Sequence, residues 1–348
     1  MVTIRSSIRT ALFAVITLCL TTSFTRGDTY SWTNFQSDIP GVAAHVDPNL
    51  VNPWGMAANS SGTTIWVSDN GTGVSTLYHQ DGAAQSLVVT IPTAKQNRGT
   101  GNPTGIVFNS TAFFKVTLNG NSQPARFIFV SEDGSISGWN PSLDQMHAII
   151  AVDNGTNKGS NAAVYKGATL GSANGHNFLF VTNFHTGQVE TYDETFHRVN
   201  PNGFVDPNLP AGYAPFGIRN FNDQIYVTYA LQDKKKHDDV AGPGNGFVNV
   251  FDTSGNFVKR LISNGSLNAP WGLALVEGDK LWVGNFGDGK INNYDPVTGA
   301  FLGTINQADG TPLQFDGLWD LLTLGSGVYF TAGIADEAHG LFGLITED

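Results

Sequence analysis

Six short apolar runs recur along the chain, and none of them alternates with polar residues. They are rich in β-branched and aromatic side chains, a pattern typical of β-strands that are buried on both faces. The runs occupy residues 64–68 (TIWVS), 127–131 (FIFVS), 178–182 (FLFVT), 224–228 (QIYVT), 280–284 (KLWVG) and 327–331 (GVYFT). Their recurrence predicts an all-β repeat protein.

A glycine followed by apolar residues precedes each run, and we call these glycines the hub markers. They are Gly55, Gly105, Gly167, Gly217, Gly272 and Gly317, with spacings of 50, 62, 50, 55 and 45 residues. After each run we expect a third strand that ends in an aromatic residue and a turn residue, and then an amphipathic fourth strand. Four antiparallel strands in each of six units predict a six-bladed β-propeller, in which small glycines suit the crowded axis.

The last unit lacks an outer strand, because the chain ends soon after the segment 340–345. The segment 30–35 (YSWTNF) alternates in polarity and precedes the first marker without a partner of its own. We therefore expect it to pair with 340–345 and close the ring, since an open blade edge promotes aggregation.

The first 27 residues have the pattern of a secretory signal peptide. Arg5 and Arg9 precede the apolar run 11–20, which is too short to span a bilayer. The sequence thus predicts residues 1–27 as a signal peptide, residues 28–348 as a single propeller domain, and a secreted protein, periplasmic or at the cell surface in a bacterium. The only cysteine, Cys19, lies inside the signal segment.

The charge of the chain argues against nucleic acid as a partner. The net charge is −11, and removing residues 1–27, which carry three Arg and no acidic residue, changes it to −14. Phosphate contacts need clustered Lys and Arg, and no long basic run is present. No second apolar stretch is long enough to cross a membrane. We expect a monomer with an extracellular ligand or protein partner.

Loops before the first strand of each blade and between its second and third strands open on one face, which we call the mouth. These loops carry a ring of amides and acids with one histidine. The candidate ligand-binding residues are Asn52, Asn70, Asn102, Asn183, Tyr229, Asn268 and Asn285, the candidate metal ligands are Asp69, Asp133 and Asp316, and the candidate catalytic residues are His185, Glu132 and Asp133. Oxygen-rich rings suit Ca²⁺. The alternative is that Asp-Asn-Gly and Glu-Asp-Gly are tight turns without a ligand.

The fourth unit contains an insertion, residues 230–246 (ALQDKKKHDDVAGPGNG), between its second and third strands. We call it the mouth segment, because a loop at this position lies over the mouth. Long loops in compact domains are often functional. Asp238 and Asp239 are added to the ligand-binding candidates, and Asp233 and His237 are also within reach. The alternative is a solvated charge run at 234–236 with flexible glycines behind it.

Several catalytic signatures are absent from the sequence. The other histidines have no zinc-ligand spacing such as HExxH, and neither a GxSxG motif nor a P-loop occurs. Five Asn-x-Ser/Thr sequons occur, at Asn59, Asn70, Asn109, Asn154 and Asn264. For Asn70, glycosylation and ligand binding at the mouth are alternative interpretations.

The phrases DPNLVNPWG (residues 47–55) and DDVAGPGNG (residues 238–246) resemble a family of secreted NHL-like six-bladed propellers, some of which carry a PEP-CTERM sorting tail. The resemblance covers nearly all of residues 28–348. It implies the propeller fold but no particular activity, and the sequence ends in LITED rather than a sorting tail. More distantly, the expected arrangement of blades is similar to that of lactonase-like and lyase propellers, which place a metal at the mouth.

Three functions are consistent with these observations. The first is a binding protein that holds a glycan, peptide or small molecule at the mouth, through a metal ion or directly. The second is a Ca²⁺-dependent hydrolase, lactonase or lyase at the same mouth. The third is a structural component of an extracellular matrix or wall. No nucleophile–base pair is evident in the sequence, which favours binding.

Overall fold

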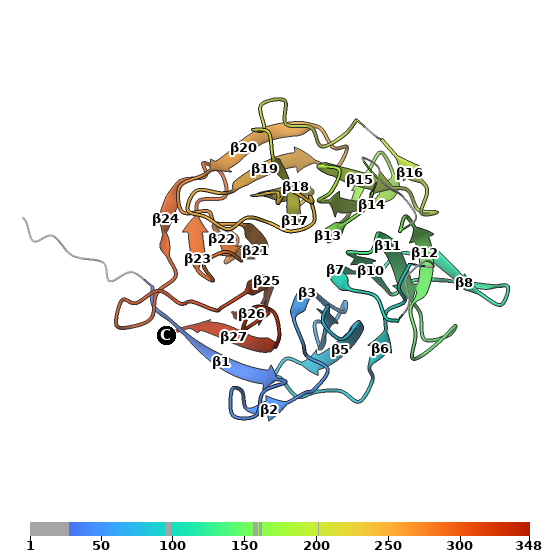
Figure 1. The fold of residues 1–348 in the computed structure, drawn as a ribbon, viewed down its shortest axis with the longest axis horizontal. Coiled ribbons are helices and arrows are strands. Elements are labelled where there is room, and N and C mark those ends of the chain that lie inside the picture. The colour runs from blue at the N-terminus through green and yellow to red at the C-terminus, as the bar shows by residue number, and fades with distance from the viewer. Residues whose placement is uncertain (1–27, 95–98, 156–158, 160–161, 201) are drawn as a thin grey trace, which may run out of the picture.

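The chain folds into a ring of six β-sheets (Figure 1). A computed structural model describes residues 28–94, 99–155, 159, 162–200 and 202–348; the predicted signal peptide lies outside these residues. The all-β six-bladed propeller predicted from the sequence is confirmed. Among the described residues there is no apolar helix of membrane-spanning length.

Each blade has four antiparallel strands, running from the axis to the rim. Blade 1 is β3 (Pro53–Ala58), β4 (Thr64–Asp69), β5 (Val74–His79) and β6 (Val89–Thr90); blade 2 is β7 (Pro103–Phe108), β10 (Phe127–Ser131), β11 (Ser135–Trp139) and β12 (Ile149–Asp153). Blade 3 is β13 (Tyr165–Ala173), β14 (His176–Asn183), β15 (Gln188–Tyr192) and β16 (Arg198–Val199); blade 4 is β17 (Tyr213–Phe221), β18 (Gln224–Leu231), β19 (Phe247–Asp252) and β20 (Phe257–Ser263). Blade 5 is β21 (Pro270–Val276), β22 (Lys280–Asn285), β23 (Ile291–Tyr294) and β24 (Phe301–Thr304).

Blade 6 is completed by the start of the chain. It contains β25 (Leu318–Leu324), β26 (Gly327–Ala332) and β27 (Leu341–Glu347), and β1 (Tyr30–Ser37) is its outer strand. β1 runs antiparallel to β27 from the pair Tyr30–Glu347 to the pair Ser37–Leu341. The predicted closure of the ring is confirmed. Two short additions lie outside the four-strand plan, β2 (His45–Val46) beside β1 and the hairpin of β8 (Lys115–Leu118) and β9 (Asn121–Pro124).

The sixth hub marker is Asp320, three residues after the predicted Gly317. In blade 4 the Gly217 amide donates a hydrogen bond to the Thr228 hydroxyl (2.8 Å), and in blade 6 the Asp320 amide donates to the Thr331 hydroxyl (3.1 Å). These equivalent bonds align Asp320 with the glycines of the other blades. Gly317 is a glycine for a different reason: its φ is +61°, a left-handed conformation that favours glycine.

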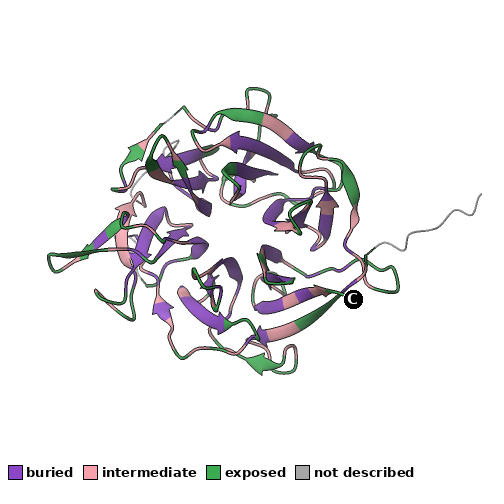
Figure 2. Ribbon diagram, turned by 180° about the vertical axis from the view of Figure 1, so that it is seen from behind, coloured by how far each residue is buried: buried purple, intermediate pink, exposed green. Residues whose placement is uncertain are grey.

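The core consists of apolar layers between neighbouring blades and one cluster at the hub. The inner strands are buried, whereas the outer strands combine exposed and intermediate residues with a few buried ones (Figure 2). Glycine at the markers permits this packing: a Cβ on Gly217 would lie 2.1 Å from the carbonyl oxygen of Trp271 in the next blade. The blades therefore approach one another closely at the axis, and the residues next to the markers are forced together there.

Candidate functional site

An aromatic layer crosses the hub. The residue before each marker contributes to it, and these residues are Trp54, Thr104, Lys166, Phe216, Trp271 and Trp319. The rings of Trp54 and Trp319 stack with centroids 3.4 Å apart, and Trp54 meets Trp271 edge-to-face at 5.9 Å. Four of the six residues form one buried cluster with Phe184. This layer separates the mouth from the opposite end of the hub.

Lys166 is the one charged member of the aromatic layer. Its side chain is 2% exposed, and its Nζ lies 4.9 Å from the centre of the Trp54 ring and 5.9 Å from that of Phe184. It forms an ion pair with Glu132, and its Nζ lies 3.6 Å from an oxygen of Asp238. Burial is the largest single influence and lowers the pKa of the ammonium, but Glu132, with smaller contributions from Asp238 and Asp239, raises the pKa overall. Lys166 is therefore a fixed positive charge at neutral pH.

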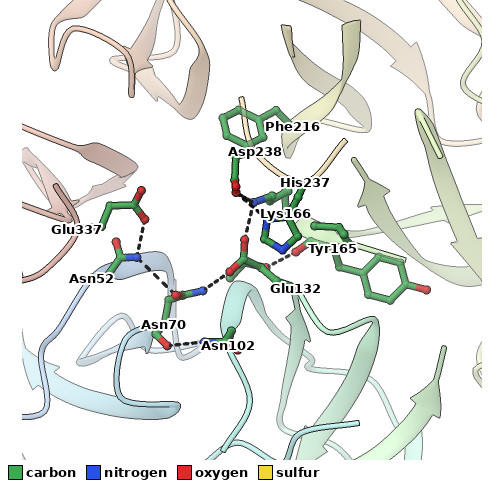
Figure 3. A network of polar contacts seen from close by, with 12 residues as sticks. Asn52, Asn70, Asn102, Glu132, Tyr165, Lys166, Phe216, His237, Asp238 and Glu337 are labelled. Atoms are coloured by element: carbon green, nitrogen blue, oxygen red, sulfur yellow. Dashed lines mark hydrogen bonds and ion pairs between the residues drawn. The ribbon is translucent and has the colours of Figure 1, made fainter. Parts of the chain in front are cut away.

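A chain of amides extends from Glu132 along the mouth (Figure 3). Asn70 Nδ2 donates to a carboxylate oxygen of Glu132 (3.0 Å), and Asn52 Nδ2 lies 3.4 Å from Asn70 Oδ1 and 2.6 Å from a carboxylate oxygen of Glu337. Asn102 donates to the backbone oxygen of Asn70 (3.3 Å). Asn52, Asn70 and Asn102, all predicted from the sequence, thus lie in one hydrogen-bonded network that links blades 1, 2 and 6.

Backbone strain places Glu337 in this network. Ala335, Asp336 and Glu337 are three successive non-glycine residues with positive φ, at 56°, 52° and 63°. Each such residue costs of order 1–3 kcal/mol, and strain of this kind collects at functional sites. The turn between β26 and β27 therefore keeps an unfavourable conformation that directs a carboxylate to the mouth.

The mouth segment lies over the axis. Asp238 contacts Lys166 of blade 3, although the segment belongs to blade 4, and His237 Nδ1 lies 2.7 Å from Asp238 Oδ1. The segment is held at both ends: the carboxylate of Asp233 accepts the His237 amide (2.9 Å), and Asn268 Oδ1 accepts the Gly242 amide (2.6 Å). Lys234, Lys235 and Lys236 are exposed, as the alternative of a solvated charge run expects, whereas Asp238 lies against Lys166 at the mouth.

Negative charge is in excess around Lys166. The carboxyl groups of Glu132, Asp238, Asp239 and Glu337 surround this one ammonium group. Burial, together with the neighbouring carboxylates, raises the pKa of Asp239 to about 7 and also raises the pKa of Glu337. The mouth is therefore poised to take up a cation, either a proton or a metal ion.

The raised pKa of Asp239 predicts a pH dependence of stability in metal-free buffer. The folded protein holds a proton on Asp239 up to a pH of about 7, whereas an unfolded chain loses it near 4, so the free energy of unfolding falls as the pH rises through this window. One such group contributes a slope of up to about 1.4 kcal/mol per pH unit. We expect urea denaturation between pH 4.5 and 7 to show a shallower slope for Asp239→Asn than for the wild type. Identical slopes would contradict the assignment.

Three side chains of the mouth can share one metal ion. Glu132, His237 and Asp238 each offer a ligand atom, and these atoms lie within 4.8 Å of one another. Ca²⁺ prefers six to eight oxygen ligands, whereas two carboxylates and an imidazole suit an ion such as Zn²⁺. The donor set therefore fits a transition-metal ion better than the calcium expected from the sequence.

The three predicted metal ligands lie outside this group. Asp69 is buried at the end of β4, where a carboxylate oxygen accepts the Thr76 amide. Asp133 accepts the Thr93 hydroxyl and the Ser135 amide. Asp316 is exposed and holds the turn that precedes Glu337, by accepting the amide of Ala335. In each case the carboxylate serves a turn or a strand end, as the alternative interpretation expects.

Two of the predicted binding residues point into their own blades. Asn183 is fully buried and donates to Glu190 (2.9 Å) in blade 3. Tyr229 packs in the core of blade 4 with Phe247 and Val227, and burial raises the pKa of its phenol. Neither contacts the network around Lys166 among the described residues.

The remaining predicted residues support the loops of the mouth. Asn268 holds Gly242 of the mouth segment, and Asn285 Oδ1 accepts the backbone amide of Asn268 (3.1 Å). His185 is partly exposed, and its Nε2 lies 2.9 Å from the carbonyl oxygen of Gly159. These side chains shape the mouth without joining the carboxylate cluster.

The sequence analysis missed Lys166 and Glu337. Lys166 had a visible signal, because the third marker phrase, Tyr165–Lys166–Gly167, places a lysine where the first and fifth have tryptophan. No signal in the sequence marked Glu337, because its position depends on the left-handed backbone of Ala335, Asp336 and Glu337, none of which is glycine.

The fold and the site together define a six-bladed β-propeller with a covered, carboxylate-rich mouth. The chain belongs to the family of two proteins of Acanthamoeba polyphaga mimivirus. It is 30% identical to Uncharacterized protein L690 over 321 residues (88% of this chain, 83% of the relative) and 30% identical to Uncharacterized protein R648 over 320 residues (88% and 77%). No family model matches the chain.

Solved structures share the fold at low sequence identity. An aldose sugar dehydrogenase from Escherichia coli superimposes with a TM-score of 0.56 at 11% identity, over 92% of this chain and all of the other. A streptogramin B lyase gives a TM-score of 0.53 at 15% identity (92% and 98% covered), and a gluconolactonase from Xanthomonas campestris gives 0.52 at 14% (86% and 87%). At these identities the likeness shows the propeller fold alone.

Proposed function

We propose that this protein is a secreted, monomeric ligand-binding propeller that holds a divalent metal ion at its mouth and binds a small polar ligand beside it. Glu132, His237 and Asp238 would hold the ion, and the amides of Asn70 and Asn102 would donate to oxygen atoms of the ligand. Residues 1–27 would direct export, as expected for an NHL-like secreted propeller. The observation that carries the proposal is the convergence of three ligand atoms within 4.8 Å.

Charge supports a bound cation at this position. Lys166 offsets only part of the negative charge of the four surrounding carboxyl groups. Burial is the main cause of the raised pKa values of Asp239 and Glu337, and the neighbouring carboxylates add to the rise. A divalent ion would lower the energy of these carboxylates. The imidazole of His237 must be neutral to bind a metal, and its pKa is raised mainly by its hydrogen bond to Asp238, so affinity should increase with pH.

Thermal melting tests the metal site. We expect protein freed of metal with EDTA to melt at a higher temperature after addition of Zn²⁺, by roughly 5 °C at a hundredfold excess over the dissociation constant. Ca²⁺ should produce a smaller shift. His237→Ala should abolish the response, whereas His185→Ala, which changes the same residue type outside the cluster, should retain it. No shift with any divalent ion, or an equal loss in both variants, would contradict the proposal.

A hydrolase or lyase acting at the same mouth is the second candidate. The observation that favours it is Lys166, a buried positive charge beside several carboxyl groups, because such pairs polarise carbonyl groups and move protons. The propellers of similar fold include a streptogramin B lyase and a gluconolactonase. Turnover of lactone substrates by the wild type and its loss in Lys166→Met would favour this candidate over binding alone.

A further inference from the structure

A cavity of about 390 Å³ occupies the end of the hub opposite the mouth. It lies beyond the aromatic layer, with Trp271 in its wall, and the inner strands of all six blades line it. Its lining combines apolar residues, among them Met56, Ile106, Leu170 and Leu273, with the polar residues Thr169 and Asn220. This size is typical of small-molecule sites.

Two charged residues face this cavity, and both depart from the repeat. Asp320 replaces the hub glycine in blade 6, and Arg219, two residues after the hub glycine of blade 4, stands where blades 1 and 5 have alanine. Arg219 Nη2 donates to Asp320 Oδ1 (2.5 Å) and to the backbone oxygen of Leu321 (3.2 Å). The other carboxylate oxygen of Asp320 accepts the Met56 amide (2.7 Å).

The pair of Arg219 and Asp320 has no net charge, and some of its hydrogen-bond donors are unused. A guanidinium has five N–H donors. Among the described residues only Nη2 of Arg219 is engaged, so its Nε and Nη1 donors remain for a ligand. The carboxylate of Asp320 neutralises Arg219, which disfavours a second carboxylate as much as a cation. An acceptor oxygen on an uncharged molecule satisfies the donors without unbalancing the charge.

We propose that this cavity binds an uncharged, largely aliphatic molecule with one acceptor oxygen, of the ketone or ester class, whose oxygen accepts from Arg219 and whose chain packs against the apolar strands. The site is separate from the mouth and does not depend on the function proposed there. Its residues come from strands whose positions are fixed by the ring, so it is preformed.

Binding of 2-octanone, followed by titration calorimetry, tests this site. We expect one molecule bound per chain, with octanoate and octylammonium at least about tenfold weaker, since each leaves a charge uncompensated. Ala58→Phe, at the wall of the cavity, should abolish binding. Ala300→Phe, the same change at the exposed rim, should leave it unchanged. No binding to the wild type, or equal binding to both variants, would overturn the proposal.

A second variant tests the role of charge. Asp320→Gly restores the glycine of the other five blades and removes the partner of Arg219. We expect its preference to reverse, so that octanoate binds at least about tenfold more tightly than 2-octanone. An unchanged preference in a folded variant would show that Arg219 does not contact the ligand and would overturn the assignment. If this variant does not fold, the Ala58→Phe and Ala300→Phe pair decides the question.

Discussion

Deletion of residues 28–37 should lower the free energy of unfolding by roughly 5 kcal/mol or more. The deletion removes β1, the outer strand of blade 6, and exposes the edge of β27 along its length. It also removes the buried ring of Tyr30, which meets Trp282 edge-to-face at 5.0 Å, and the ring of Phe35, which packs on Tyr329 and Phe342. Loss of one large aromatic side chain from a core typically costs 3–5 kcal/mol.

Denaturation with guanidinium measures this loss, and two point variants separate strand pairing from side-chain packing. Tyr30→Ala should cost about 3 kcal/mol because the ring is 5% exposed. Trp32→Ala, with the side chain 40% exposed on the same strand, should cost about 1 kcal/mol. A deletion variant as stable as the wild type would show that the ring does not depend on the N-terminal strand for closure.

The fold could be predicted from the sequence because the sequence repeats. The six apolar runs fall on the second strand of each blade, because a strand covered by neighbouring blades cannot alternate in polarity. The closing strand followed from counting strands in the last unit. The hub marker of blade 6 could not be predicted, because the residue there is Asp320 rather than glycine, and the nearby Gly317 has the expected apolar residues after it. The pairing of β25 with β26 and the hydrogen bond between Asp320 and Thr331 reveal the register.

The site could be predicted from the sequence only in part, because an Asn or Asp after a strand can either bind a partner in a neighbouring blade or hold a turn in its own blade. Asn70 reaches across to Glu132 in the next blade, whereas Asn285 turns back to bind Ser266 and Asp288 in its own blade. Both stand at the end of the apolar run that forms the second strand of a blade, so the sequence does not distinguish them. The difference depends on which neighbouring blade offers a partner, and that is a property of the assembled ring.

The ion pair of Lys166 and Glu132 should show strong energetic coupling. Glu132→Gln removes the principal partner of a buried ammonium and leaves Asp238, whose side chain is 65% exposed. Removing one partner of a buried pair leaves an uncompensated charge, so we expect a loss of about 3 kcal/mol. Lys166→Met should cost about 1 kcal/mol, because methionine fits against Trp54 and the remaining carboxylate of Glu132 still accepts from Asn70.

The double variant Lys166→Met/Glu132→Gln then tests whether the ion pair stabilises the fold or instead serves ligand binding at the mouth. With both charges removed, no buried ion lacks a partner, so the double variant should lose only about 1 kcal/mol, which corresponds to a coupling energy of about 3 kcal/mol. Equilibrium unfolding of the four proteins measures this coupling, and additive losses would show that Lys166 does not depend on Glu132. A double variant as stable as the wild type would mean that the charges contribute little to folding. Their position among Asn70, Asp238 and Glu337 would then be explained by what the mouth binds.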